Sequence, residues 1–351
     1  MGQTPWSARV PLDPPGPGPN WSRTLFHQVL PVSLAAIVPV WNGREVLERL
    51  LASLEAQTQP LSELLVVDNG STDGAPDMAR NRGARVIAMG RNEGFAAAVN
   101  RGIRESQAEW IAVLNSDVEL APDYLATLHA AGAPFATGKI LMARDPRRID
   151  GTFDAVSRGA VAWRVGYGRA DGPAFSERRE IWSVPWTAAL FRREVFEAVG
   201  LLDERFRSYY EDVEFGMRCA SRGISGLYIP EAVAWHRGSA ALGRWHPEVV
   251  RLTARNQCYL AALYYSPRDA WPILVAQGLW GLVALRHGAG RAWLRGKIEG
   301  IRQAGALRPN GAARLGPVLR ESERTIYRVQ EATGFDGFWR LYFLLAGRPL
   351  Q

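Results

Sequence analysis

The sequence has few cysteines, few lysines and no long apolar run. Its two cysteines, Cys219 and Cys258, cannot form a disulfide framework or a cysteine metal site, so we expect two ordinary thiols in a reducing compartment. The longest apolar stretch, residues 271–285, is shorter than the roughly 20 residues that a membrane-spanning helix needs. The first twenty residues also lack a secretory signal pattern. These absences predict a cytoplasmic protein without a transmembrane segment.

The positive charge is concentrated near one end of the chain. The formal net charge is +7, and Lys139 and Lys297 are the only lysines among 42 basic residues. Residues 286–351 hold twelve basic and five acidic side chains, whereas the rest of the chain is balanced. A basic region of this kind favours an anionic membrane surface or a phosphate-bearing partner over a nucleic-acid groove.

Four apolar runs alternate with helical patterns in the first part of the chain. Continuous apolar strands separated by helices are typical of an α/β fold with a mostly parallel sheet flanked by helices. We therefore predict a Pro/Gly-rich disordered leader over residues 1–30, an α/β domain over 31–250 and a helical, basic region over 251–351. The four strands are expected at residues 34–40, 64–68, 84–89 and 110–117.

Polar residues follow each of these strands. In an open parallel sheet, ligands bind beyond the carboxyl ends of the strands, so the polar strand ends predict a binding site. The run VVDNGSTDG (66–74) places the Asp68 carboxylate and free backbone N–H groups at one turn, although this pattern also makes an ordinary tight turn. Gly94 marks either a helix N-terminus that can face negative charge or a simple helix start. The polar residues at the four strand ends are Asn42, Asp68 with Asn69, Asn92, and Asn115 with Asp117.

The run LNSDVEL (114–120) places two oxygen-bearing side chains at the end of the fourth strand. Asn115 and Asp117 are two positions apart, so on a strand both side chains should point to the same side. A carboxylate there can hold Mg²⁺ or Mn²⁺ against a diphosphate. A surface turn is the alternative interpretation.

Several motifs together resemble a known family. They are VPVWN (38–42), VVDNGSTDG, NEGFAAAVN (92–100), LNSD and LLDERFRSYYEDVEFGMRCASRG (201–223), followed by IPEAVAWH (229–236). In this order they resemble the family 2 glycosyltransferases with the GT-A fold, especially the bacterial rhamnosyltransferase-like branch, from about Leu34 to His236. The resemblance implies a GT-A (Rossmann-like) α/β domain, a nucleotide-sugar donor and a divalent cation (Mg²⁺ or Mn²⁺) as cofactor.

The resemblance also implies roles for individual residues. Asp117 matches the metal-binding carboxylate, and His236 a position that can complete the metal or diphosphate site. Asn115 stands where many relatives carry an acidic residue, which leaves fewer anionic ligands. Without the resemblance, a histidine that ends a strand is more often structural. The residues expected to contact the nucleotide-sugar are Pro39, Val40, Asn42, Asp68, Asn69, Asn92, Gly94, Phe95, Asn115, Ser116, Trp186 and Thr187.

Glu211 and Asp212 match the Glu-Asp pair of the family. In an inverting transfer, a base removes the proton of the acceptor hydroxyl as its oxygen attacks the anomeric carbon. We assign that role to Asp212, with Glu211 orienting the acceptor or the base. On their own, two acidic residues at a helix start are usually partners of the helix dipole. Arg255 and Asn256 also match a recurrent pair, for which helix packing is the default interpretation.

The predicted function is inverting transfer of a sugar from a nucleotide-diphosphate donor to a saccharide or lipid-linked saccharide in cell-surface polysaccharide synthesis. The branch points to rhamnose from dTDP-rhamnose. Two alternatives stay open: a polyprenyl-phosphate glycosyltransferase, and a catalytically silent nucleotide-sugar-binding module. A dinucleotide-binding oxidoreductase would need G-x-G-x-x-G after the first strand, where the residues are VPVWNGRE (38–45).

The basic segment over residues 271–302 has a partly amphipathic pattern. It either packs on the catalytic domain or attaches peripherally to the inner face of the cytoplasmic membrane, where a lipid-linked acceptor would be presented. The membrane contact is predicted to use residues 271–351. In the run RAWLRGKIEGIR (291–302), the pattern sets the apolar Trp293, Leu294, Ile298 and Ile301 against the basic Arg291, Arg295, Lys297 and Arg302.

Overall fold

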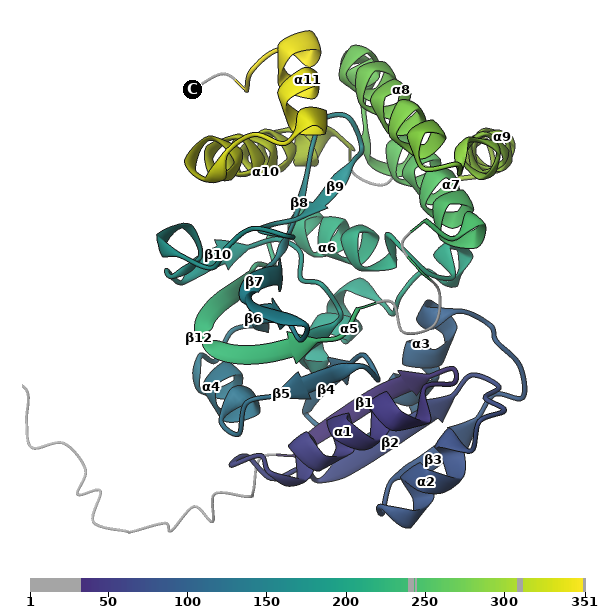
Figure 1. Ribbon diagram of the computed structural model, residues 1–351, viewed down its shortest axis with the longest axis vertical. Coiled ribbons are helices and arrows are strands. Elements are labelled where there is room, and N and C mark those ends of the chain that lie inside the picture. The colour runs from purple at the N-terminus through teal and green to yellow at the C-terminus, as the bar shows by residue number, and fades with distance from the viewer. Residues whose placement is uncertain (1–32, 239–242, 244, 308–311, 350–351) are drawn as a thin grey trace, which may run out of the picture. The chain divides into compact units, whose positions relative to one another are not determined.

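The computed structural model describes residues 33–238, 243, 245–307 and 312–349, which belong to one compact unit (Figure 1). The leader predicted over residues 1–30 lies outside these residues. The first part of the unit alternates strands and helices. Its elements are β1 (Leu34–Val40), α1 (Arg44–Glu55), β2 (Glu63–Asp68), α2 (Ala75–Asn81), β3 (Arg85–Ala88), α3 (Phe95–Glu105), β4 (Trp110–Leu114), β5 (Val118–Leu120) and α4 (Tyr124–Ala130).

The middle of the chain adds further strands to the same sheet. Its elements are β6 (Phe135–Met142), β7 (Asp145–Gly151), β10 (Arg179–Ile181), β11 (Ala188–Arg192), α5 (Arg193–Val199), α6 (Glu211–Ser221) and β12 (Gly226–His236). The strand order is β10-β12-β6-β11-β4-β1-β2-β3, with β5 paired to β12 and β7 to β6. Strands β1 to β4 pair in parallel and β6 pairs in parallel with β12, whereas β5, β7, β10 and β11 pair antiparallel. A separate two-stranded sheet joins β8 (Asp154–Val156) to β9 (Ala162–Arg164).

The predicted strands lie at the expected positions, with one exception. The strand predicted over residues 110–117 ends at Leu114. The N–H of Val118 then donates to the carbonyl of Asn115 at 3.3 Å, which turns the chain before β5 begins. The side-chain alternation assumed for Asn115 and Asp117 was therefore wrong, because both residues lie in a turn.

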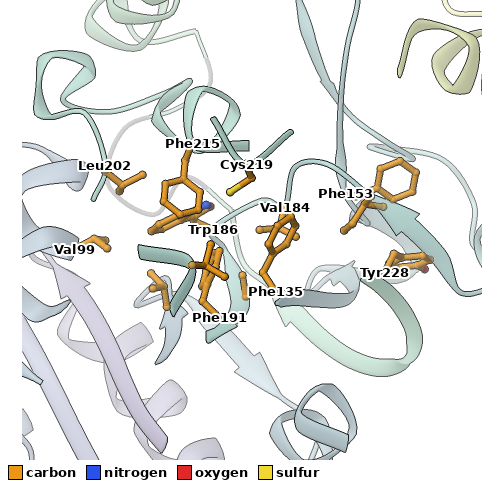
Figure 2. Packing of buried hydrophobic residues seen from close by; sticks show 14 of the residues in the cluster. Val99, Phe135, Phe153, Val184, Trp186, Phe191, Leu202, Phe215, Cys219 and Tyr228 are labelled. Atoms are coloured by element: carbon orange, nitrogen blue, oxygen red, sulfur yellow. The ribbon is translucent and has the colours of Figure 1, made fainter. Parts of the chain in front are cut away.

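The β1 strand shows why the sheet buries both faces. All seven of its residues are buried. Ile37 and Val67 point toward α3, and Gly102 of that helix leaves room for them, since an added Cβ would lie 2.4 Å from Ile37. Further along the sheet, Trp186, Phe191 and Phe215 form the aromatic centre of the core (Figure 2).

In the described part of the chain, five α-helices follow the sheet. They are α7 (Pro247–Tyr264), α8 (Ala270–Arg286), α9 (Gly290–Ala304), α10 (Ala312–Thr333) and α11 (Gly337–Ala346). In Figure 1, α8 lies between α9 and α11, and α7 packs closely on α9. None of the helices in the described part of the chain is both long and apolar enough to cross a membrane.

Lys297 differs from its predicted place on the exposed basic face of α9. The structure buries its side chain, and its Nζ donates to Gln257 Oε1 at 2.9 Å and to Gln277 Oε1. The helix packs on both α7 and α8, and this face of α9 is turned toward them. The alternation of apolar and basic residues could not reveal two buried glutamine acceptors from distant positions.

Candidate active site

The sheet reverses its strand order between β1 and β4. Strand β1 pairs with β2 on one side and with β4 on the other. Pairing with β4 stops at Ile37, opposite Val113, while β1 continues to Val40. The carboxyl ends of the two strands therefore separate, which is where open α/β sheets bind their ligands. Pro39 lies in the continuing part of β1, where its missing N–H breaks no pairing with β4.

The turns after β1 and β2 hold each other. Asn42, at a left-handed φ of 60°, donates its N–H to Ser71 Oγ at 2.8 Å and accepts the Thr72 N–H at 2.9 Å through Oδ1. Asp68 is buried at the end of β2, and its Oδ1 accepts the Ser71 N–H at 2.8 Å. The structure thus brings Asn42 and Asp68 to one point at the sheet edge, as the sequence predicted.

Asn69 and Asn92 connect β2 to the start of α3. The Asn69 amide donates to the Gly94 carbonyl at 3.1 Å and to Asn92 Oδ1 at 3.3 Å, and its oxygen accepts the Glu93 N–H at 2.9 Å. Asn92 Oδ1 also accepts the Gly94 N–H at 3.0 Å. The two asparagines therefore use most of their side-chain polar atoms in hydrogen bonds to each other and to the backbone of Glu93 and Gly94.

The N-terminus of α3 is occupied by protein groups. The Phe95 N–H donates to Ser208 Oγ at 3.1 Å, and the Ala96 N–H donates to the Arg207 carbonyl at 2.8 Å. Gly94 has a φ of 98°, and a Cβ there would lie 2.8 Å from the Arg207 carbonyl oxygen. The segment that contains Arg207 can approach this closely only because residue 94 is a glycine. The first N–H groups of α3 are hydrogen-bonded to Arg207 and Ser208 and do not face an open space.

Asp117 and His236 lie side by side, although they are far apart in the sequence. His236 Nε2 is 3.1 Å from Asp117 Oδ1, and its Nδ1 is 2.8 Å from Asp150 Oδ2. Arg164 donates to the same Asp150 oxygen at 3.3 Å. Burial lowers the pKa of His236, but the hydrogen bonds to the two carboxylates outweigh burial and raise it to about 9. Burial likewise raises the pKa of Asp150, and His236 and Arg164 bring it below its usual value.

The separation within this hydrogen-bonded pair is also compatible with two neighbouring ligands of one cation. Adjacent ligands of an octahedral ion at about 2.1 Å lie about 3 Å apart. The separation of Asp117 Oδ1 and His236 Nε2 is close to that distance. Asp150 orients the imidazole through its second nitrogen, a common arrangement around metal-binding histidines. No group of three or more candidate ligand side chains occurs within the described residues, so diphosphate oxygens and water would have to complete the shell.

The predicted catalytic carboxylates begin α6. Glu211 is buried, whereas Asp212 is half-buried and accepts the Val213 N–H at 2.8 Å. Burial, followed by the Asp212 charge, raises the pKa of Glu211 well above its usual value. Burial also raises the pKa of Asp212, although Arg164 acts in the opposite direction.

Asp154 joins this group and was missed by sequence reasoning. It is 9% exposed, and burial together with the Asp212 charge raises its pKa to about 8, despite Arg164. Burial and the neighbouring charge therefore both favour the neutral form of Asp154. The only available signal was that Asp154 follows Asp150 by four residues in DGTFDAV (150–156), a spacing without specific meaning on its own.

Several buried polar atoms of the described residues lack a hydrogen-bond partner, and two of them belong to Glu211 and Asp154. In the described part of the chain, seven buried side-chain N or O atoms lack a hydrogen-bond partner. The Asp154 N–H donates to the Ser183 carbonyl, and the Asn115 N–H to that of Thr187. Five of the seven are Asp154 Oδ2, Ser183 Oγ, Trp186 Nε1, Thr187 Oγ1 and Glu211 Oε2.

Trp186 has a packing role in addition. Its ring centroid lies 4.6 Å from that of Phe191 and 5.0 Å from that of Phe215, and the side chain is 2% exposed (Figure 2). The ring is therefore covered by the core, and its indole nitrogen is buried as well.

Comparison with known proteins identifies the family. The family model described as glycosyl transferase family 2 matches residues 35–200. The N-acetylglucosaminyl-diphospho-decaprenol L-rhamnosyltransferase of Mycobacterium tuberculosis is 32% identical over 249 residues, which cover 62% of this chain and 78% of that enzyme. The chain belongs to glycosyl transferase family 2. This confirms the resemblance recognised from the motifs, and as a family 2 member the protein is a glycosyltransferase.

Two further comparisons bear on pathway and fold. The succinoglycan biosynthesis protein ExoO of Rhizobium meliloti is 34% identical over 111 residues, which cover 30% of this chain and 32% of that protein. The crystal structure of GalNAc-T7 with UDP, GalNAc and Mn²⁺ matches with a TM-score of 0.58 at 14% identity, covering 92% of this chain and 59% of that one. The predicted α/β GT-A fold is confirmed. The relatives agree with sugar transfer in cell-surface polysaccharide synthesis.

Proposed function

We propose that this family 2 glycosyltransferase is an inverting enzyme that transfers rhamnose from a nucleoside-diphosphate donor to a sugar carried on a polyprenyl diphosphate. The observation that carries the proposal is the 32% identity with the L-rhamnosyltransferase across 78% of that enzyme. By its name, that relative acts on N-acetylglucosaminyl-diphospho-decaprenol. The product would be a lipid-linked precursor of a cell-surface polysaccharide.

Asp212 is proposed as the base. It is half-buried at the first turn of α6, so a hydroxyl group can reach it, while Glu211 is buried beside it. Asp212 takes the proton of the acceptor hydroxyl as the oxygen attacks the anomeric carbon, and the nucleoside diphosphate leaves from the opposite face. Glu211 orients the acceptor or Asp212.

Asp117 and His236 are proposed to hold a divalent cation. When bound, such an ion stabilises the negative charge that develops on the diphosphate leaving group. Asn115 and Ser116 lie on the same turn and would line the diphosphate side. The remaining predicted contacts, from Pro39 to Phe95, would line the nucleoside side at the ends of β1 and β2 and at the start of α3.

A transfer assay tests the proposal directly. The chain is incubated with Mn²⁺, an N-acetylglucosaminyl-diphospho-polyprenol acceptor and, in separate reactions, dTDP-rhamnose, UDP-glucose or GDP-mannose. We expect product only with dTDP-rhamnose, seen as one deoxyhexose added by mass spectrometry, with inverted anomeric configuration by NMR. Transfer of another sugar, retention of configuration, or transfer onto polyprenyl phosphate itself would contradict the proposal.

The protein is also proposed to dock on the inner face of the cytoplasmic membrane through α8, α9 and α11. Most large apolar side chains that are exposed in the described residues lie on these three helices, which pack together. Exposed arginines on the same helices would attract anionic lipid headgroups. The exposed apolar residues are Trp271, Leu274, Leu282 and Leu285 on α8, Leu294, Ile298 and Ile301 on α9, and Leu341, Leu344 and Leu345 on α11.

Reversing two of these charges should weaken membrane binding. We expect Arg291→Glu/Arg295→Glu to reduce cosedimentation with phosphatidylglycerol vesicles by about 30-fold or more at low salt, because each basic residue near such a surface contributes about 1 kcal/mol. The control is Arg101→Glu/Arg104→Glu, which makes the same charge change on exposed arginines of α3. Equal binding by both variants, or no binding by the unchanged chain, would contradict the docking surface.

A further inference from the structure

The segment immediately before the catalytic carboxylates adopts an unusual backbone. Arg207, Tyr209 and Tyr210 have positive φ angles of 62°, 68° and 71°, and none is a glycine. Such conformations persist only where the surrounding structure holds them, and they tend to gather at functional sites. Tyr210 directly precedes Glu211 and caps α6. The orientation of Asp212 therefore depends on whatever holds this loop.

Helix α7 holds the loop through Asn256. The Asn256 side chain is fully buried, and its Nδ2 donates to the carbonyls of Phe206 at 2.9 Å, Ser208 at 3.0 Å and Tyr209 at 2.6 Å. Its oxygen accepts the Nε–H of Arg255 at 2.9 Å. One side-chain amide thus gathers three backbone carbonyls of the strained loop.

The neighbours of Asn256 on α7 also form hydrogen bonds to this loop. Arg255 Nη2 donates to the carbonyls of Arg205 at 3.0 Å and Phe206 at 2.9 Å. Gln257 Nε2 donates to the Tyr210 hydroxyl at 2.9 Å, and its oxygen accepts a hydrogen bond from the buried Lys297. Residues 255–257, three consecutive buried polar residues of α7, therefore hydrogen-bond to residues 205–210.

The opposite side of the loop contacts the nucleotide-binding half of the site. The Arg207 carbonyl and Ser208 Oγ accept the N–H groups of Ala96 and Phe95 at the start of α3. A single loop thus joins the start of α3 to the start of α6. A shift of the loop would move the base relative to the donor pocket.

We propose that Asn256, supported by Arg255, is a positioning residue for sugar transfer. It holds the loop over residues 206–210 so that Asp212 faces the acceptor hydroxyl and the anomeric carbon at the same time. The proposal rests on the proposed function in one respect, the assignment of Asp212 as the base. It replaces the default interpretation of this pair as ordinary helix packing.

The test compares Asn256→Ala with a matched control, Gln330→Ala. Gln330 is equally buried on a helix, but it bonds Arg169 and Asp336. Both variants are assayed with dTDP-rhamnose and N-acetylglucosaminyl-diphospho-polyprenol at a temperature where circular dichroism shows them folded. We expect kcat of Asn256→Ala to fall by about 30-fold or more, since misplacing a reacting group by about 1 Å can cost about 100-fold. The control should keep kcat within about threefold. A wild-type kcat for folded Asn256→Ala would overturn the proposal.

A double substitution separates positioning from general stability. If Asn256 acts through Asp212, adding Asn256→Ala to Asp212→Asn should slow the residual reaction by less than about threefold, because residues that act as a unit are not additive. Full additivity would overturn the proposal. If Asp212→Asn alone kept its turnover, the base assignment would fail, while the loss in Asn256→Ala would still stand as its own result. Asn256→Ser, which keeps one donor, is used if the alanine variant does not fold, and an intermediate loss is expected.

Discussion

Replacing Asp212 with asparagine is expected to lower the turnover of sugar transfer by about 100- to 10,000-fold, the usual cost of losing one general base. Asparagine keeps the size of the side chain and can still accept the Val213 N–H, but it cannot take a proton from the acceptor. Donor binding, measured by calorimetry with the nucleoside diphosphate, should stay nearly unchanged. Asp123→Asn, an exposed residue at the start of α4, is the matched control.

The pH profile gives an independent check on this residue. A base works only when it is deprotonated, and burial raises the pKa of Asp212. Activity should therefore be lost on the acid side at a higher pH than for an exposed aspartate. Turnover above a few per cent of the original in Asp212→Asn, or an acid limb at the ordinary aspartate value, would count against Asp212 as the base.

Replacing Asp117 with alanine should weaken cation and donor binding together. The substitution removes the only carboxylate of the proposed Asp117–His236 ligand pair and leaves His236 bonded to Asp150 alone. We expect the affinity for Mn²⁺ in the presence of a nucleoside diphosphate to fall by at least about 100-fold, as measured by calorimetry. Loss of an orienting residue around a metal typically costs about 10- to 100-fold, so Asp150→Asn should have a smaller effect.

A chelator tests the same site without a substitution. Treatment with EDTA should abolish transfer by the unchanged chain, and added Mn²⁺ should restore it. Glu119→Gln serves as the control, because Glu119 lies two residues from Asp117 and bonds Arg237 on the surface. If Asp117→Ala bound Mn²⁺ and the nucleotide as the unchanged chain does, the ligand assignment would be wrong.

Much of the fold could be predicted from local sequence patterns. The LAAIVPV run forms β1 with the predicted bounds, and the run at residues 291–302 lies within α9, in the region predicted to be helical. These elements depend on short apolar patterns that a reader can recognise in a single stretch. The end of β4 could not be predicted in this way, because the turn after Leu114 depends on the hydrogen bond from Val118 and on the pairing of β5 with β12.

Part of the candidate site could be predicted from the sequence, because some of its residues lie at the ends of predictable strands. Asn42, Asp68 and Asp117 lie at strand ends, and topology places strand ends of a parallel sheet at one edge. Asp150 and Asp154 belong to no such pattern, since Asp150 is placed by the irregular pairing of β7 with β6 and by its contact with His236, and Asp154 by its bond to Ser183. Lys297 was predicted on the exposed face of its helix, because the sequence does not show that its buried partners, Gln257 and Gln277, come from other helices.

The sequence by itself determined the fold class, the family and which polar residues lie at the strand ends, because these follow from short apolar runs and motifs. Only the tertiary structure decided which groups complete the site. The contacts of His236 with Asp117 and of Asn256 with Tyr209 join residues 119 and 47 positions apart. Asp212 follows a loop that contains left-handed residues and is hydrogen-bonded by Asn256 of a sequence-distant helix, and no local pattern carries that information.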